Sequence, residues 1–300
     1  MPKKTGVAKV KNTKAKPLIG FIGQGFVGKA YADEFESRGF KTVRYALEEP
    51  YRGNKDKIKE CDFVFIAVPT PSTPKGFDDS IIRSAMKLVD AGKVAIIKST
   101  ILPGTTASIQ KDNPNIFVFH SPEFLTEVTA LYDAGHPNRN IVGIPKRSKD
   151  FEKKAQEVLA ILPEAPFEIV TGAEEAELIK YGGNCWFYFK VIFINMLYDV
   201  ASKKSIDWGT VRDVMAADPR IGRTHLDPVH KSGRGAGGHC FIKDFAAFEN
   251  MYKNTIGDFA GNKVLEALRD KNIDLLLSSN KDLDLLSGVY GESLIKKRKK

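Results

Sequence analysis

The chain has 300 residues, 42% of them hydrophobic and 28% charged, which is typical of a globular protein and long enough for two domains. Its net charge of +9 comes from the two ends, because six lysines lie in residues 1–17 and five basic residues form 296–300. The remaining chain is close to neutral, which argues against specific nucleic-acid binding and predicts two solvated basic tails.

The three cysteines are far apart and form no Cys-x-x-Cys pair, and the five histidines lack metal-ligand spacing. We therefore expect no metal site and no disulfide framework. A small, odd number of cysteines favours a reducing, cytoplasmic compartment. The most apolar stretch, residues 185–200, is interrupted by Lys190, Asn195 and Asp199, so we expect no membrane insertion.

Strand-like and helix-like patterns alternate from residue 18 to residue 171. Apolar, strand-like runs lie at 18–22, 41–45, 62–68, 94–98, 116–119 and 140–144. One helical pattern follows the first run and ends at residue 38, and two others cover 80–91 and 149–161. Continuous apolar runs are typical of strands buried on both faces. The alternation predicts an α/β domain of the Rossmann type, with a doubly wound parallel sheet, over residues 18–171.

The pattern becomes helical after Thr171, which is a candidate N-cap with Glu174 three residues later. A long helix is predicted to residue 203, followed by helices at 207–215, 243–252 and 263–277. These predict an all-helical second domain over 172–278, with 279–300 as a C-terminal segment. The long helix is apolar around most of its circumference, at Phe187, Phe189, Ile192 and Phe193, so it needs a partner.

A glycine motif marks the start of the first helix. Residues 23–28 read G-x-G-x-x-G directly after a strand, the arrangement that places a dinucleotide pyrophosphate on a helix N-terminus. We expect NAD to bind here through Gly23, Gly25, Phe26, Val27 and Gly28. Glu48 has the spacing of a ribose-binding acid, although the second strand is predicted to end at Tyr45. Arg44 is a candidate partner for a 2′-phosphate, so NADP remains an alternative cofactor.

A cysteine flanked by glycines and charges is the sharpest local signal. Residues 237–244 read Gly-Gly-His-Cys-Phe-Ile-Lys-Asp. Positive charge near a thiol lowers its pKa and makes it a nucleophile, so Lys243 predicts a reactive Cys240. Cys61 and Cys185 lie in apolar patterns and are expected to be buried and inert.

Six motifs together resemble the UDP-glucose/GDP-mannose dehydrogenase family, most closely its UDP-glucose 6-dehydrogenase branch. In family order they are Val-Pro-Thr-Pro at 68–71, Lys-Ser-Thr at 98–100, Pro-Gly-Thr at 103–105, Pro-Glu-Phe-Leu at 122–125, Asp-Pro-Arg-Ile-Gly at 218–222 and the Cys240 motif. The resemblance covers residues 18–275 and implies a homodimer. The family's third, nucleotide-binding domain has no counterpart here, so we expect recognition of the sugar-phosphate part or a cap from a separate polypeptide.

The resemblance implies a double oxidation of a sugar C6 alcohol with NAD. Cys240 would form a thiohemiacetal with the aldehyde and then a thioester, which water releases as the acid. Lys180 and Asn184, at i and i+4 on one helix face, would stabilise an oxyanion. Asp244 would act as a general base.

The remaining roles are also implied by the resemblance. Glu127 would assist hydrolysis, and Glu123 and Thr100 would position substrate or water. Thr70 and Lys243 would contact the cofactor. The implied substrate-binding residues are Phe124, Leu125, Arg220, Lys231 and Gly237, with Arg220 reaching over from a neighbouring subunit.

Two other functions remain open on the sequence. A 3-hydroxyacid dehydrogenase also pairs a Rossmann domain with a helical domain and uses a lysine and an asparagine, but it oxidises once and needs no cysteine. A non-catalytic binding homologue would keep the fold alone. In simpler interpretations, Lys180 and Asn184 are exposed helix residues, and Glu123 and Glu127 form a solvated pair.

Overall fold

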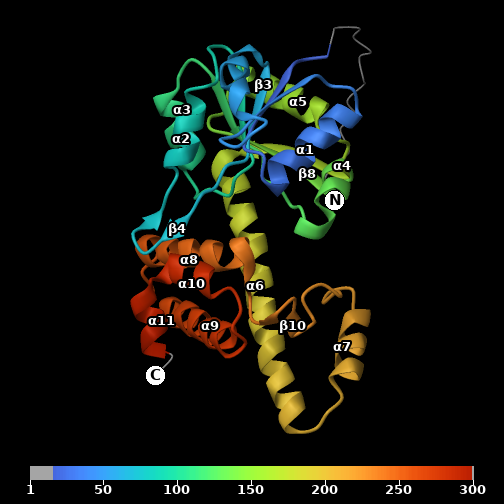
Figure 1. The fold of residues 1–300 in the computed structure, drawn as a ribbon, viewed down its shortest axis with the longest axis vertical. Helices are drawn as coiled ribbons and strands as arrows, with labels where there is room; N and C mark the ends of the chain where they lie inside the picture. Colours follow the sequence, from blue (N-terminus) through green and yellow to red (C-terminus); the bar gives the residue numbers. More distant parts are fainter. Residues whose placement is uncertain (1–15, 299–300) are drawn as a thin grey trace.

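A sheet of seven strands forms the first domain (Figure 1). The computed structural model describes residues 16–298. The strand order is β2-β1-β3-β6-β7-β8-β9. The strands are β1 (Ile19–Ile22), β2 (Thr42–Tyr45), β3 (Phe63–Ile66), β6 (Val94–Ile97), β7 (Phe117–His120), β8 (Arg139–Ile144) and β9 (Phe167–Gly172). The order turns back beside β1, which is the switch point where open α/β sheets bind ligands.

Helices cover both faces of this sheet. They are α1 (Phe26–Ser37), α2 (Ser80–Met86), α3 (Thr105–Asp112), α4 (Ala130–Gly135) and α5 (Lys149–Ile161), with 3₁₀ turns η1 (Arg52–Glu60) and η2 (Glu127–Thr129). Phe21 and Phe65 stack at 5.3 Å on one face and belong to a core with α1, α4 and α5. Ile22 and Ile66 point to the opposite core, beneath α2 and α3. The doubly wound α/β fold predicted from the sequence is therefore confirmed.

The second domain is built around α6 (Ala173–Lys203), the long yellow helix of Figure 1. It packs against α7 (Trp208–Ala217), α8 (Gly238–Thr255) and α9 (Phe259–Ser278). The chain continues into α10 (Leu283–Tyr290) and α11 (Glu292–Arg298), which cover α8 and α9. Within residues 16–298, no helix is long and apolar enough to cross a bilayer.

Several local expectations were wrong. The sheet is mixed, because β8 pairs with β7 in the antiparallel sense. The domain with α6 also holds a short ladder of β10 (Val229–His230) and β11 (Gly233–Arg234), and the first domain holds another, of β4 (Ser72–Thr73) and β5 (Gly76–Phe77). Thr171 is not an N-cap, because it lies in β9, where it pairs with Gly143 of β8. The N-cap position of α6 is Gly172, which has no side chain to cap the helix.

The predictions for the two basic tails fare differently. Residues 1–15, together with Lys299 and Lys300, lie outside the described residues, so the expectation for the N-terminal tail is not addressed. The C-terminal basic run begins inside α11 rather than in a solvated tail. Arg298 forms ion pairs with Asp270 and Asp274 of α9, at 2.7 and 2.9 Å.

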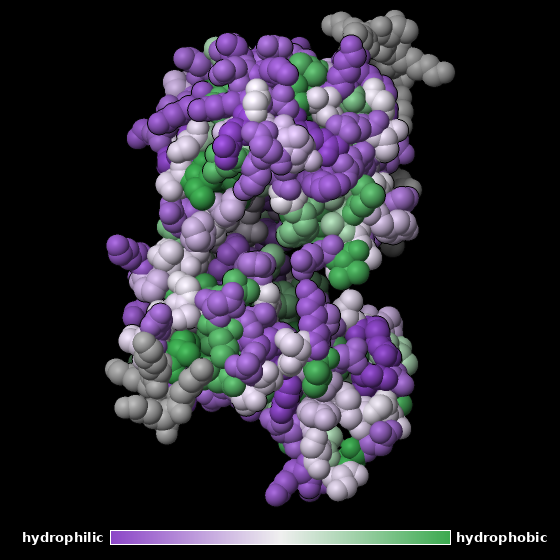
Figure 2. Space-filling model, in the orientation of Figure 1, coloured by the Kyte–Doolittle hydropathy of each residue, from purple (hydrophilic) through white to green (hydrophobic). Residues whose placement is uncertain are grey.

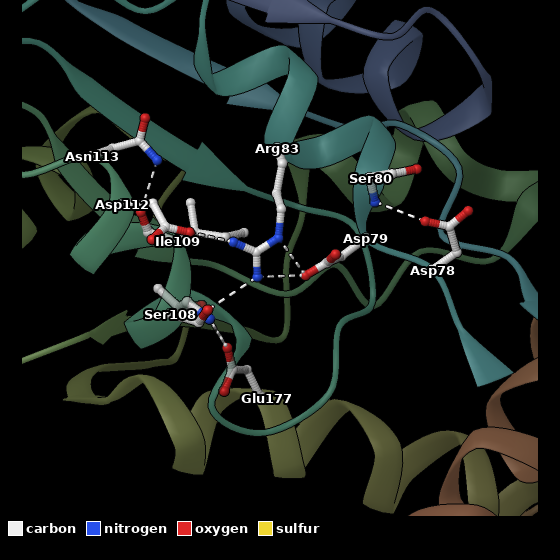
Figure 3. A network of polar contacts seen from close by, with 10 residues as sticks. Asp78, Asp79, Ser80, Arg83, Ser108, Ile109, Asp112, Asn113 and Glu177 are labelled. Atoms are coloured by element: carbon white, nitrogen blue, oxygen red, sulfur yellow. Dashed lines mark hydrogen bonds and ion pairs between the residues drawn. The ribbon is translucent and has the colours of Figure 1, made fainter.

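Polar contacts join α2, α3 and α6 beneath the sheet (Figure 3). Arg83 of α2 pairs with Asp79 at 2.9 Å and with Asp112 of α3 at 2.7 Å. Glu177 of α6 is fully buried and accepts hydrogen bonds from the backbone N–H groups of Gly104 and Thr106, at 2.7 and 2.8 Å. This carboxyl group thereby caps α3, and burial raises its pKa to about 7.

We expect Glu177→Ala to lower the free energy of unfolding by about 2–4 kcal/mol, because buried donors at the start of α3 lose their acceptor. The exposed Glu174, one turn away, provides the matched control, and Glu174→Ala should cost less than about 1 kcal/mol. Urea unfolding measures both values. Equal losses for the two variants would show that the α3 cap contributes nothing to stability.

Candidate active site

The glycine motif between β1 and α1 has the geometry of a dinucleotide site. Gly23 adopts a φ of +91°, and a Cβ on Gly28 would lie 2.0 Å from the Gly23 carbonyl oxygen, so helix and turn approach closely. A Cβ on Gly25 would meet nothing within 4 Å. No side chain caps α1 at Gly25, which leaves the helix N-terminus open to an anionic group. These features fit a pyrophosphate.

Phe26 and Val27 begin α1, and Phe26 is exposed. Glu48 is exposed and lies three residues after β2 ends. Arg44 contacts α1, with its guanidinium 2.7 Å from Asp33 and 2.6 Å from Glu36. Both carboxylates balance the Arg44 charge, and they raise its pKa against the effect of burial.

A buried ion pair joins the two domains. Lys180 of α6 donates from Nζ to Oε1 of Glu123 at 2.8 Å, and both side chains are less than a tenth exposed. Oε2 of Glu123 accepts the N–H of Leu125 at 2.7 Å. Lys180 is therefore not an exposed helix residue, and Glu123 does not form a solvated pair with Glu127.

One turn further along α6, Asn184 reaches the next acid. Its Nδ2 donates to Oδ2 of Asp244 at 2.6 Å, while Lys243 donates to Oδ1 of the same carboxylate at 2.6 Å. Asp244 is buried in α8. Lys180 and Asn184 thus share one face of α6 and each holds a carboxylate from a different segment.

Cys240 lies in the first turn of α8, half-buried, rather than in a loop. Burial raises the pKa of its thiol and the Asp244 carboxylate adds to the rise, while Lys180 and Lys243 oppose it. The expectation of a net lowered pKa was wrong, because desolvation outweighs the two cations. The thiol nevertheless interacts electrostatically with Asp244, Glu123, Lys180 and Lys243. These four residues, with Asn184 and Cys240, are called the ion-pair cluster.

The other two cysteines differ from Cys240. Cys61 and Cys185 are both buried, and desolvation raises the pKa of each thiol, that of Cys61 to about 12. Neither interacts with a lysine of the cluster. Such thiols are poor nucleophiles.

Three predicted residues lie outside the cluster. Glu127 and Lys231 form an exposed ion pair at 3.3 Å, so Glu127 contacts a cation predicted to bind substrate. Arg220 is 88% exposed and pairs with Asp218 two residues earlier, at 2.6 Å. Among residues 16–298, the hydrogen bonds and the ion pair of Arg220 go to Asp218 and do not connect it to Cys240.

Other predicted residues line the neighbouring strand ends. Thr70 donates its hydroxyl to the Thr100 carbonyl at 2.8 Å, which joins the segments after β3 and β6. Phe124 stacks under the Arg139 guanidinium at 3.6 Å and lies 5.6 Å from Lys180 Nζ. Gly237, predicted to contact substrate, packs against Asp282, since a Cβ there would lie 2.0 Å from a carboxylate oxygen.

Sequence reasoning missed Lys98. It ends the β6 run, is 3% exposed, and donates to Ser121 Oγ at 3.0 Å with its ammonium 4.4 Å from the Tyr31 ring. Burial lowers its pKa to about 7, and Glu123 counteracts the shift. A lysine directly after four apolar strand residues was the available signal.

Figure 2 shows the surface hollowed where the two domains meet.

Two family domains match the chain consecutively. The NAD-binding domain of the UDP-glucose/GDP-mannose dehydrogenase family matches residues 47–162, and its central domain matches residues 174–273. The chain belongs to the UDP-glucose/GDP-mannose dehydrogenase family. The cluster of Glu123, Lys180, Asn184, Cys240 and Asp244 lies where these two family domains meet.

Individual relatives agree with this family. The putative UDP-glucose 6-dehydrogenase YtcA of Bacillus subtilis is 34% identical over 215 residues, which are 67% of this chain and 49% of the relative. The UDP-glucose 6-dehydrogenase YwqF of the same organism is 32% identical over 253 residues, 79% of this chain and 54% of that protein. The chain spans about half the length of the curated relatives it matches.

Solved structures share the fold. A UDP-glucose dehydrogenase from Pyrobaculum islandicum has a TM-score of 0.73 at 25% identity, covering 90% of this chain and 72% of its own. A 3-hydroxyisobutyrate dehydrogenase from Mycobacterium tuberculosis has a TM-score of 0.68 at 16% identity, covering 92% of this chain and 99% of its own. At this identity the second similarity concerns the fold alone.

We expect Lys180→Met to cost about 3–5 kcal/mol of unfolding free energy, because the Glu123 carboxylate stays buried without its cation. Adding Glu123→Gln should recover part of that loss. Urea denaturation of both single variants and the double variant completes the cycle. The exposed Lys29–Asp33 pair is the control, and Lys29→Met should cost at most about 1 kcal/mol. Purely additive losses would show that the pair is not coupled.

Proposed function

We propose that this chain is an NAD-dependent dehydrogenase of nucleotide sugars that oxidises a C6 alcohol to the uronic acid. The observation that carries the proposal is the position of Cys240 in the first turn of α8, four residues before Asp244, whose carboxylate accepts from Asn184 and Lys243 where the two family domains meet. Membership of the family supports the substrate class.

The nicotinamide cofactor would bind at Gly23–Gly28, and when bound it accepts a hydride from the substrate carbon. Thr70 and Thr100 follow the ends of β3 and β6, the next two strands after β1 in the sheet, and would line the far end of the cofactor. The open N-terminus of α1 would hold the pyrophosphate. NAD is the proposed cofactor, and the two carboxylates on Arg44 leave that cation a poor partner for a 2′-phosphate.

The side chains of the cluster have complementary roles in the proposed reaction. Asp244 would take the proton of the alcohol as hydride leaves, giving an aldehyde. The Cys240 sulfur would then add to the aldehyde carbon, and the thiol proton would pass to the carbonyl oxygen, which gives a thiohemiacetal. Lys180 and Asn184 would donate to that oxygen as it gains charge. Both residues already donate to carboxylates, but each has a further N–H available.

Hydrolysis would complete the sequence. Loss of a second hydride, to a second NAD, together with the hydroxyl proton would convert the thiohemiacetal to a thioester. Water would then attack the thioester carbonyl carbon, which releases the acid and returns a proton to the Cys240 sulfur. Glu123 is held rigidly by Lys180 and the Leu125 N–H, which suits it to orient that water. Glu127 lies on the surface with Lys231, so this exposed pair would instead contact the substrate's charged part.

The oxidation should yield two reduced nicotinamides for each sugar nucleotide consumed. Cys240→Ser should reduce formation of the acid by about 10²-fold or more, because the serine hydroxyl is a far weaker nucleophile than a thiolate. Cys61→Ser, at a buried site remote from the cluster, should leave turnover unchanged. The assay follows absorbance of the reduced cofactor against the acid formed, with UDP-glucose as first substrate.

A single reduced nicotinamide per substrate, unaffected by Cys240→Ser, would favour the 3-hydroxyacid dehydrogenase alternative, whose fold the M. tuberculosis structure shares. Binding of cofactor without reduction, for every sugar nucleotide and hydroxyacid offered, would favour the non-catalytic homologue.

We also propose a homodimer formed along α6. Four apolar residues, Ile179, Trp186, Phe193 and Val200, recur every seven positions and therefore share one face of the helix. Their side chains are 41%, 62%, 58% and 52% exposed. Ile192, predicted to be part of the apolar surface, is instead fully buried in the domain core. A repeating apolar stripe on a straight helix suits the same stripe of a second copy.

Light scattering at micromolar concentration should therefore give the mass of a dimer. Phe193→Asp should shift the measured mass to that of the monomer, because the interface would bury two negative charges, one from each copy. Val214→Asp, at an exposed apolar position on α7, is the control and should leave the mass unchanged. A monomer for the wild-type chain would refute the proposed dimer.

A further inference from the structure

The turn between α9 and α10, residues 279–282, lies against the glycine-rich run that leads into Cys240. Ser279 Oγ accepts the N–H of Arg234 at 2.9 Å. Lys281 is 5% exposed, and its ammonium donates to the carbonyl of Gly235 at 3.0 Å and to that of Gly233 at 3.4 Å. We call residues 279–282 the clamp turn.

Asp282 connects the clamp turn to the catalytic helix itself. Its Oδ2 accepts the N–H of Gly238, the first residue of α8, at 2.7 Å. The N-cap position, Gly237, has no side chain, so Asp282 supplies the cap from 44 residues further along the chain. Cys240 follows two residues after the capped N–H.

The spacing of glycines in the run 233–238 fits this contact. A Cβ on Gly237 would lie 2.0 Å from Asp282 Oδ2, and one on Gly233 would lie 2.5 Å from Ser279 Oγ. Any larger residue at these two positions would displace the clamp turn. The glycines therefore serve the approach of residues 279–282 as well as the exposure of the cysteine.

The other side of the run is held by α9. Asn272 is 1% exposed and exchanges two hydrogen bonds with Ala236, accepting its N–H at 2.7 Å and donating to its carbonyl at 3.0 Å. Hydrogen bonds thus hold the backbone leading to Cys240 at five positions: Gly233, Arg234, Gly235, Ala236 and Gly238. The match to the family's central domain ends at residue 273, before the clamp turn begins.

We propose that Asp282, with Lys281, is a positioning residue for Cys240: its carboxylate fixes the first turn of α8 and so sets the place of the thiol. The consequence for turnover rests on the proposed function, whereas the consequence for the thiol does not. The experiment therefore measures the thiol directly.

The test is the rate at which iodoacetamide alkylates each cysteine of the full chain, resolved by peptide mass spectrometry. Asp282→Ala should speed alkylation of Cys240 about fivefold, the factor equivalent to losing an N-cap of about 1 kcal/mol. Asp282→Asn keeps an oxygen acceptor for the Gly238 N–H and should return the rate to within about twofold of wild type. Buried Cys61 and Cys185 should stay unreacted.

Two further variants make the test specific. Gly237→Ala should speed Cys240 alkylation as Asp282→Ala does, because the new Cβ displaces the carboxylate. Asp284→Ala removes an exposed acid two residues after Asp282, in the first turn of α10, and should leave the rate of Cys240 alkylation unchanged.

Wild-type alkylation of Cys240 in Asp282→Ala would overturn the proposal. So would a rate for Asp282→Asn equal to that of Asp282→Ala, since charge rather than the hydrogen bond would then be responsible. Faster alkylation of all three cysteines would mean a general loss of structure and would also overturn it. If alkylation changes as expected while no sugar nucleotide is oxidised, the positioning role stands and the proposed function fails.

Discussion

Three polar residues on one face of α6 hold together everything around the thiol. Glu177, Lys180 and Asn184 are spaced three and four apart, so their side chains lie one above another along the helix. They contact, in order, the start of α3, the acid after β7, and the acid of α8. Because one rigid helix carries all three, a shift of α6 along its axis would break every one of these contacts together.

The cluster is costly to bury, and its composition reflects that cost. Removing carboxylates and ammonium groups from water is unfavourable unless each has a partner. Lys180 pairs with Glu123, and Asp244 has both Asn184 and Lys243. Among residues 16–298, the close partners of the buried Lys98 ammonium are a hydroxyl and aromatic rings, and burial lowers its pKa. The pairing leaves the region near neutral overall, which suits a site where the thiol changes its charge in the proposed reaction.

The shared fold does not decide between one oxidation and two. The 3-hydroxyisobutyrate dehydrogenase and the UDP-glucose dehydrogenase both superpose on this chain over about nine-tenths of its length. What distinguishes the proposed chemistry is the first turn of α8, where Cys240 is presented and where residues 279–282 fix the backbone. The proposed function therefore depends on a short segment and its support rather than on the architecture.

The sequence by itself determined the doubly wound sheet, the nucleotide motif and the long helix, because each depends on local periodicity or on a short run of glycines. It also brought Lys180 and Asn184 onto one helix face. It did not determine that Glu123 pairs with Lys180 across 57 residues, that Glu127 instead reaches Lys231, or that Asp282 caps α8.

The net direction of the Cys240 pKa was predicted wrongly for the same reason. Neighbours in sequence revealed Lys243, but burial of the thiol, which outweighs the effect of that cation on the pKa, is a property of the packed chain. Contacts between distant segments and the loss of water around them arise only when the chain is packed, and no local pattern records them.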